Sequence, residues 1–178
     1  MKKTFPFLAL GFLTLATSSI ADHHEETNKP ETADTDAIDF ATQVFPIFEN
    51  KCLSCHAQPY EKKPRTEGAK GRTSKPKSKY RMDAKKFLLA GGSITADIAA
   101  GTMEGVPALT PGDASKSSVY TYTTLPEDDD FYMPTKGDGL TSEEKEILKK
   151  WIDQGADFGE WIGNEKEDVI PYDPNNTK

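Results

Sequence analysis

The stretch NKCLSCHAQP, residues 50–59, contains both cysteines of the 178-residue chain, Cys52 and Cys55, and the only histidine beyond position 24, His56. A disulfide between cysteines three positions apart closes a very small loop, so it would constrain the unfolded chain little. A zinc site needs two further Cys or His ligands, which the rest of the domain does not contain. A thioredoxin-like redox pair would follow a strand of a βαβ unit, and the sequence predicts no such unit. Another chemistry must explain this spacing.

The order Cys-x-x-Cys-His is the attachment signature of c-type haem. The two thiols add to the haem vinyl groups, and the adjacent histidine binds the iron as its proximal ligand. The spacing lets both thioether bonds reach one edge of the porphyrin while the histidine lies beneath its centre. The sequence therefore predicts one haem c, covalently bound through Cys52 and Cys55, with His56 as an iron ligand.

A second axial ligand would come from a methionine, because the other two histidines lie in a polar leader at positions 23 and 24. The methionines of the domain are Met82, Met103 and Met133. Met133 is favoured because Pro134 disfavours a helix at the preceding residue, and a Met/His pair is the pattern of cytochromes c. Met82 is interpreted as a core residue, while Met103 and an open iron position remain alternatives.

The N-terminus has the features of a secretory signal peptide, predicted over residues 1–21. Two lysines precede an apolar run, and Ser19-Ile20-Ala21 forms a small-x-small cleavage site. The run is shorter than a bilayer-spanning helix, so we expect no membrane span after cleavage and a periplasmic or otherwise exported protein. Residues 22–37 are charged, lack hydrophobic periodicity and predict a disordered linker. Asp22-His23-His24 is read as the polar start of this linker, with a copper or nickel site at the new terminus as the alternative.

The remaining chain predicts one all-α domain over residues 38–162, because no β-strand alternation of useful length is present. Asp39 is the expected N-cap of the first helix, which Pro46 should kink or divide. Thr141 and Glu144 form a capping box that opens the clearest helix. Further short helices are expected over 84–90, with Asp83 as N-cap, and over 114–125, after Asp113. Residues 163–178 are expected to form a flexible acidic tail.

A long basic loop is predicted between these helices, over residues 57–81. It carries nine Lys or Arg against two Glu in a chain whose net charge is −7. Opposite charge on one loop can orient a cytochrome during its encounter with a redox partner, and the alternative is a loop charged for solubility alone. Nucleic acid is not an expected partner outside the cytoplasm.

Four segments together resemble the planctomycete-type cytochrome c domain, over about residues 44–158. They are VFPIFENKCLSCH (44–56), KYRMDAKKFLLAGG (79–92), PGDASKSS (111–118) and MPTKGDGLTSEEKEILKKWIDQGADF (133–158). The resemblance implies a class I cytochrome c-like helical fold around one covalently bound haem, with His56 and Met133 as axial ligands. The chain departs from the family at Thr135, where the family often has a second proline, and in its longer basic loop. In such a fold, Arg81 or Tyr80 is predicted to hydrogen-bond a haem propionate, with a solvated arginine as the alternative for Arg81.

These features predict an exported mono-haem c-type cytochrome that carries single electrons and is not itself an enzyme. A monomer and an unidentified periplasmic redox partner are expected. The first alternative is a haem-based sensor with an open iron position. The second is a cytochrome subunit of a larger oxidoreductase complex, which shares the chemistry and differs only in its partner.

Overall fold

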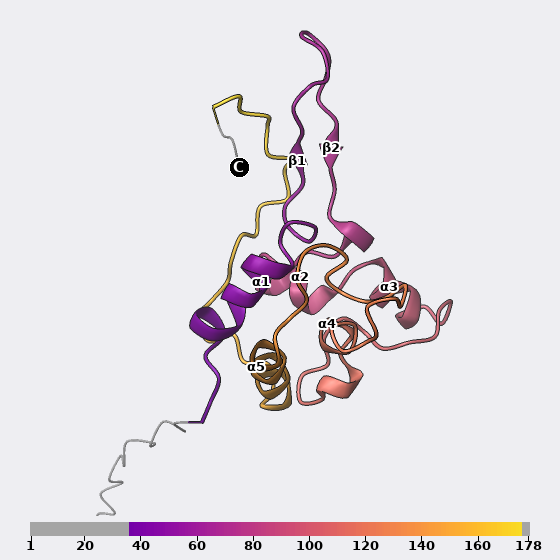
Figure 1. The fold of residues 1–178 in the computed structure, drawn as a ribbon, viewed down its shortest axis with the longest axis vertical. Helices are drawn as coiled ribbons and strands as arrows, with labels where there is room; N and C mark the ends of the chain where they lie inside the picture. Colours follow the sequence, from indigo (N-terminus) through magenta and orange to yellow (C-terminus); the bar gives the residue numbers. More distant parts are fainter. Residues whose placement is uncertain (1–35, 176–178) are drawn as a thin grey trace, which may run out of the picture. The chain divides into compact units, whose positions relative to one another are not determined.

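A computed structural model describes residues 36–175, and Figure 1 shows their arrangement. This part of the chain is mostly helical, with five α-helices and one small two-stranded sheet, so the prediction of a helical domain is confirmed at that level. The predicted signal peptide, residues 22–35 of the linker, His23 and His24 included, and the last three residues of the tail lie outside the described residues.

The first helical segment is divided near Pro46, as the sequence predicts. A π-helical turn, Phe40–Val44, leads directly into α1, Phe45–Lys51, and Pro46 lies in the first turn of α1. Pro46 has no N–H, so the π-helical bonding pattern, which reaches the Phe45 amide at Phe40 O, cannot continue through it. The predicted N-cap is also confirmed, since the Asp39 carboxylate accepts a 2.8 Å hydrogen bond from the Thr42 amide.

The last helix, α5, Ser142–Asp153, begins at the predicted capping box. Glu144 N donates to Thr141 Oγ1 at 3.1 Å, and Thr141 N donates to Glu144 Oε2 at 2.8 Å. The buried residues of this helix are Leu148, Trp151 and Ile152. Gly155 follows with a φ of +104°, a left-handed conformation that suits glycine beyond a helix end.

An aromatic cluster joins this helix to the start of the domain. The Phe40 ring lies 5.0 Å from Trp151 and 4.7 Å from Phe158, centroid to centroid. The Trp151 indole N–H donates a 2.7 Å hydrogen bond to the Asp157 carbonyl, so the buried ring leaves no polar atom unsatisfied. Phe48 of α1 packs into the same core.

The helices between these two are short: α2, Lys85–Ala90; α3, Ser93–Ala99; a 3-10 turn, Ala114–Lys116; and α4, Ser118–Thr121. Asp113 caps the 3-10 turn as expected, but the helix predicted over 114–125 is divided into two short pieces. The prediction that Asp83 caps α2 is wrong: Ala84 is the N-cap residue, because the Asp83 carboxylate pairs with Arg81.

The basic loop differs from its prediction because it contains a β-hairpin. Strand β1, Tyr60–Glu61, pairs antiparallel with β2, Thr73–Ser74, and a 3-10 turn follows at Lys77–Lys79. Figure 1 shows the hairpin extending away from the helices.

The segment after residue 162 runs beside this hairpin and does not stop at the predicted domain boundary. Tyr60 and Ile170 form a parallel bridge, and Glu61 N donates to the Ile170 carbonyl at 2.9 Å. Gly163 forms a second bridge with Ala84, at the start of α2. The hydrogen-bonded structure therefore continues to about residue 172, well into the segment expected to be a flexible tail.

Candidate functional site

The Cys-x-x-Cys-His motif forms a tight turn at the C-terminal end of α1. The Cys52 amide still bonds to the helix, at Phe48 O, and the amides of Cys55 and His56 both bond to the Cys52 carbonyl at 3.0 Å. Both cysteines are free thiols, and all three motif side chains are half-buried. The turn therefore places two thiols and one imidazole on consecutive turns of one short segment.

The His56 ring is held in one orientation by the chain that returns from the hairpin. His56 Nδ1 lies 3.1 Å from the Tyr80 carbonyl oxygen. Since a carbonyl can only accept, Nδ1 carries the hydrogen and Nε2 keeps its lone pair, which is the tautomer of a metal-binding histidine whose other nitrogen donates to a carbonyl. Burial lowers the pKa of His56, which favours the neutral imidazole that metals bind.

The environment of the Cys52 thiol favours its protonated form. Burial raises its pKa to about 12, and the charges of Glu144 and Cys55 act in the same direction. Redox-active thiols have lowered pKa values, because the thiolate is the species that attacks a disulfide. Cys52 therefore lacks the lowered pKa of an attacking cysteine in a thiol-disulfide exchange site.

Tyr80 places a buried hydroxyl beside the motif. Its ring lies edge-on to His56 at 5.7 Å between centroids, and its hydroxyl is the one buried side-chain polar atom in residues 36–175 with no hydrogen-bond partner. Burial raises the pKa of Tyr80, with the Cys52 charge as a second cause, so the group remains a neutral donor. Gly92 supports this position, since a Cβ there would lie 2.7 Å from the Tyr80 Cβ. The predicted hydrogen bond from Tyr80 to a propionate would satisfy this hydroxyl.

Arg81 is buried, and its donors are used within the protein. It binds the Asp83 carboxylate through Nε and Nη2, both at 2.8 Å, and donates to the carbonyls of Asn164 at 2.9 Å and Lys166 at 2.6 Å. Its guanidinium also lies 3.9 Å from the centre of the Phe87 ring. A propionate contact would compete with these bonds, so the geometry favours a structural role for Arg81 over its predicted ligand role.

The three methionines occupy different environments. Met82 is 3% exposed within the hydrophobic core, so its interpretation as a core residue is confirmed. Met103 and Met133 are both half-buried in loops. The Met133 amide donates to the Tyr122 carbonyl at 2.9 Å, and Lys51 at the end of α1 donates to the Asp138 carbonyl at 3.3 Å. The first bond holds Met133 to Tyr122, and the second links the loop at Asp138, five residues after Met133, to the end of α1.

Local sequence reasoning missed the contacts that hold the base of the hairpin to the motif. Lys77 N donates to the Cys55 carbonyl at 2.9 Å, and Met82 N donates to the His56 carbonyl at 2.7 Å. The backbone N–H of the buried Gln58 donates to Asp83 Oδ2 at 2.9 Å. A glutamine two residues after the histidine carries no recognisable signal, because its partner is 25 positions away in the sequence.

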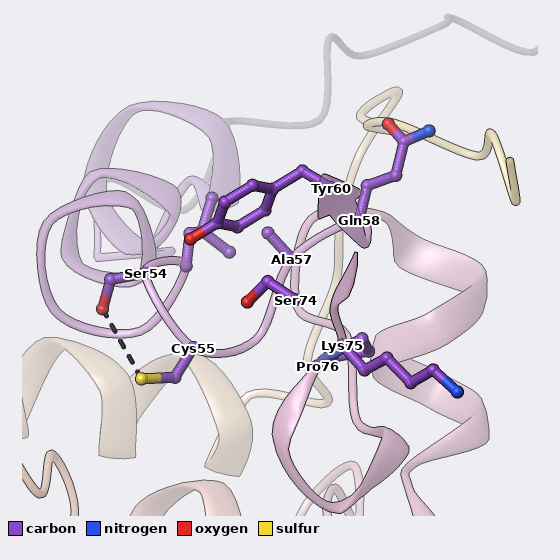
Figure 2. Close-up of a pocket in the computed structure, with 9 residues that line it drawn as sticks. Ser54, Cys55, Ala57, Gln58, Tyr60, Ser74, Lys75 and Pro76 are labelled. Atoms are coloured by element: carbon purple, nitrogen blue, oxygen red, sulfur yellow. Dashed lines mark hydrogen bonds between the residues drawn. The ribbon is translucent and has the colours of Figure 1, made fainter. Parts of the chain in front are cut away.

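A small pocket lies on the hairpin side of the motif (Figure 2). Its volume is about 10 Å³, enough for at most one water molecule. Cys55 reaches its edge, where its sulfur accepts a 3.8 Å hydrogen bond from the Ser54 hydroxyl, and Lys75 points away from it. This pocket is far too small for a porphyrin, so it is not the candidate haem site.

Comparison with family models, curated proteins and solved structures finds no match to the chain. Within residues 36–175, no helix is long and apolar enough to cross a bilayer. The same residues contain no cluster of three or more His, Cys, Asp or Glu side chains that could hold a metal ion. The resemblance to the planctomycete-type cytochrome c domain stays a prediction.

Proposed function

We propose that the protein is an exported mono-haem c-type cytochrome that carries single electrons in the periplasm. The observation that carries the proposal is the pairing of His56 Nδ1 with the Tyr80 carbonyl beside two free thiols in Cys-x-x-Cys-His order. Signal-peptide features at residues 1–21 support export, and a class I-like fold, a monomeric state and a partner protein belong to the same proposal.

The residues of the chain fit a covalently attached haem. Cys52 and Cys55 would form the two thioether bonds, and His56 would present Nε2 to the iron while Nδ1 keeps its bond to Tyr80. Met133 is the proposed second axial ligand. When bound, the haem supplies a one-electron couple. The Tyr80 hydroxyl offers a donor to a propionate, and the core around Phe48 keeps water from that side of the motif.

Covalent attachment is the direct test. Protein matured together with a haem-attachment system should give a c-type absorption spectrum, and acid-acetone extraction should leave the haem on the polypeptide. Cys52→Ala and Cys55→Ala should each remove one thioether bond, and Ser54→Ala, in the same turn, is the matched control. Recovery of all haem in the organic phase from the unsubstituted protein would refute the proposal.

Substitution of the proposed axial ligand separates a carrier from a sensor with an open iron position. Met133→Ala should abolish the far-red iron–sulfur charge-transfer band of the oxidised protein and allow carbon monoxide to bind the reduced one, because it removes the sulfur ligand. Met103→Ala, in another half-buried loop, is the control and should change neither property. If the unsubstituted protein already binds carbon monoxide readily, the sensor alternative is favoured.

A further inference from the structure

The hairpin, residues 60–79, carries an unusual concentration of exposed positive charge. It contains eight basic and two acidic residues, and all eight basic side chains are exposed. The rest of the described chain contains ten basic and twenty-two acidic residues. The basic residues of the hairpin are Lys62, Lys63, Arg65, Lys70, Arg72, Lys75, Lys77 and Lys79.

None of these eight side chains is neutralised within residues 36–175. The ion pairs there are Arg81–Asp83, Lys86–Glu167, Lys116–Asp113, Lys149–Asp153 and Lys150–Asp36, all outside the hairpin. Clustered charges of one sign raise the local concentration of oppositely charged partners and speed their association. The hairpin is therefore a local positive region on a protein of negative net charge.

The position of the hairpin links this region to the proposed haem site. Its first strand begins four residues after His56, so this end is continuous with the motif. Its other end is hydrogen-bonded to the motif, since Lys77 N donates to the Cys55 carbonyl. The Ile170 segment pairs with the free edge of β1 and holds the hairpin from its other side. A molecule that binds the base of the hairpin, at Lys75 and Lys77, would therefore be held beside the Cys-x-x-Cys-His turn.

We propose that the hairpin is the docking surface for an acidic face of a redox partner protein. This inference rests on the proposed function and names the class of its partner. A protein surface fits better than a membrane or an anionic polysaccharide, because Glu61 and Glu67 interrupt the positive charge and would be repelled by a uniformly anionic surface. Residues 61–79 also contain no exposed large hydrophobic side chain, so the tip of the hairpin offers no apolar anchor for a bilayer.

Oxidation of the reduced, haem-loaded protein by ferricyanide tests where electrons leave. One electron passes from the ferrous haem to ferricyanide, which becomes ferrocyanide. Net negative charge predicts that this rate rises with salt, whereas docking at the hairpin predicts a fall of about tenfold as added salt shortens the Debye length from about 30 Å to about 3 Å. A rate that rises with salt in the unsubstituted protein would overturn the proposal.

Two variants with the same change in net charge locate the effect. The hairpin variant replaces Lys62, Lys63, Lys75, Lys77 and Lys79 with glutamine, and the control variant replaces Lys116, Lys136, Lys145, Lys149 and Lys166 with glutamine. The hairpin variant should lose the fall with salt and the control should keep it, with unchanged haem spectra in both. Equal loss in both variants would mean that only net charge matters and would overturn the proposal.

Binding to poly-L-glutamate, measured by calorimetry, gives a readout that does not depend on electron transfer. The unsubstituted protein and the control variant should bind it at low salt, and the hairpin variant should bind about tenfold more weakly. Heparin and vesicles of anionic phospholipid serve as the other polyanions. Tighter binding to either of these than to poly-L-glutamate would overturn the choice of a protein partner. Absence of covalent haem would instead refute the proposed function and leave this binding result standing.

Discussion

The aromatic cluster and the corner formed by Cys52, Cys55, His56 and Tyr80 lie in the same domain. They differ in whether their buried polar atoms have hydrogen-bond partners. In the cluster, Phe40 and Trp151 are each 1% exposed, and the indole N–H has its acceptor. At the corner, the buried Tyr80 hydroxyl has no partner among residues 36–175, and the bond to the Tyr80 carbonyl leaves His56 Nε2 with its lone pair. A buried polar group without a partner costs about 1–3 kcal/mol of folding free energy. A bound group that accepts a hydrogen bond from the Tyr80 hydroxyl would therefore stabilise the protein at this corner. The cluster stabilises the fold, and the corner carries the candidate chemistry.

Removal of Trp151 should give the largest loss of stability. Trp151→Ala removes a fully buried ring that contacts Phe40 and Phe158 and should lower the free energy of unfolding by about 4 kcal/mol. Urea unfolding of the purified protein measures the change. Phe131→Ala is the control, because this ring is 45% exposed and should cost less than about 1 kcal/mol. Similar losses in both variants would contradict the assignment of the core to this cluster.

The helix boundaries next to the aromatic cluster could be predicted from the sequence, but the long-range contacts of the cluster and of the corner could not. Asp39, Pro46 and the capping box of α5 act on residues within four positions of themselves, so local patterns reveal them. The bond between His56 and Tyr80 joins residues 24 positions apart, and Arg81 reaches Lys166 across 85 positions. Such pairs depend on how the chain returns from the hairpin, and the two-residue strands of that hairpin are too short to show β alternation.

The same limit explains the assignments of Arg81 and of the tail. Arg81 was predicted to bind a propionate because a guanidinium suits carboxylate geometry, but the Asp83 carboxylate takes two of its hydrogen bonds. The tail has the composition of a flexible segment, yet its backbone carbonyls at 164 and 166 complete the Arg81 site. Backbone acceptors leave no trace in composition, so this packing could not be predicted.

Substitution of Arg81 should give the second-largest loss of stability. It tests whether the buried Arg81–Asp83 ion pair stabilises the region around the corner. Arg81→Met should lower the free energy of unfolding by about 3 kcal/mol, because it leaves the buried Asp83 carboxylate without its cation. Lys86→Met breaks the exposed pair with Glu167 and is the control, with an expected loss below about 1 kcal/mol.

The double variant Arg81→Met, Asp83→Leu should recover part of the loss, since removal of both charges avoids an unpaired one. The reduction potential distinguishes the two roles considered for this arginine. A structural arginine leaves the potential close to that of the unsubstituted protein, whereas a propionate ligand would shift it. Full stability in the single variant would contradict the role that the structure gives to the Arg81–Asp83 pair.

Removal of the Tyr80 hydroxyl should give the smallest loss of stability among these substitutions. It tests directly whether the corner has a hydrogen-bond donor that the aromatic cluster lacks. In the haem-loaded protein, Tyr80→Phe should lower the free energy of unfolding by about 1 kcal/mol, because the hydroxyl then has a propionate acceptor to lose. The partly buried ring itself is retained, so packing against His56 is unchanged. Tyr60→Phe is the matched control, since the Tyr60 side chain is 43% exposed and water replaces any bond its hydroxyl makes. A stabilised Tyr80→Phe variant would show that the hydroxyl stays unsatisfied with haem bound, and the corner would then lack the one donor that distinguishes it from the aromatic cluster.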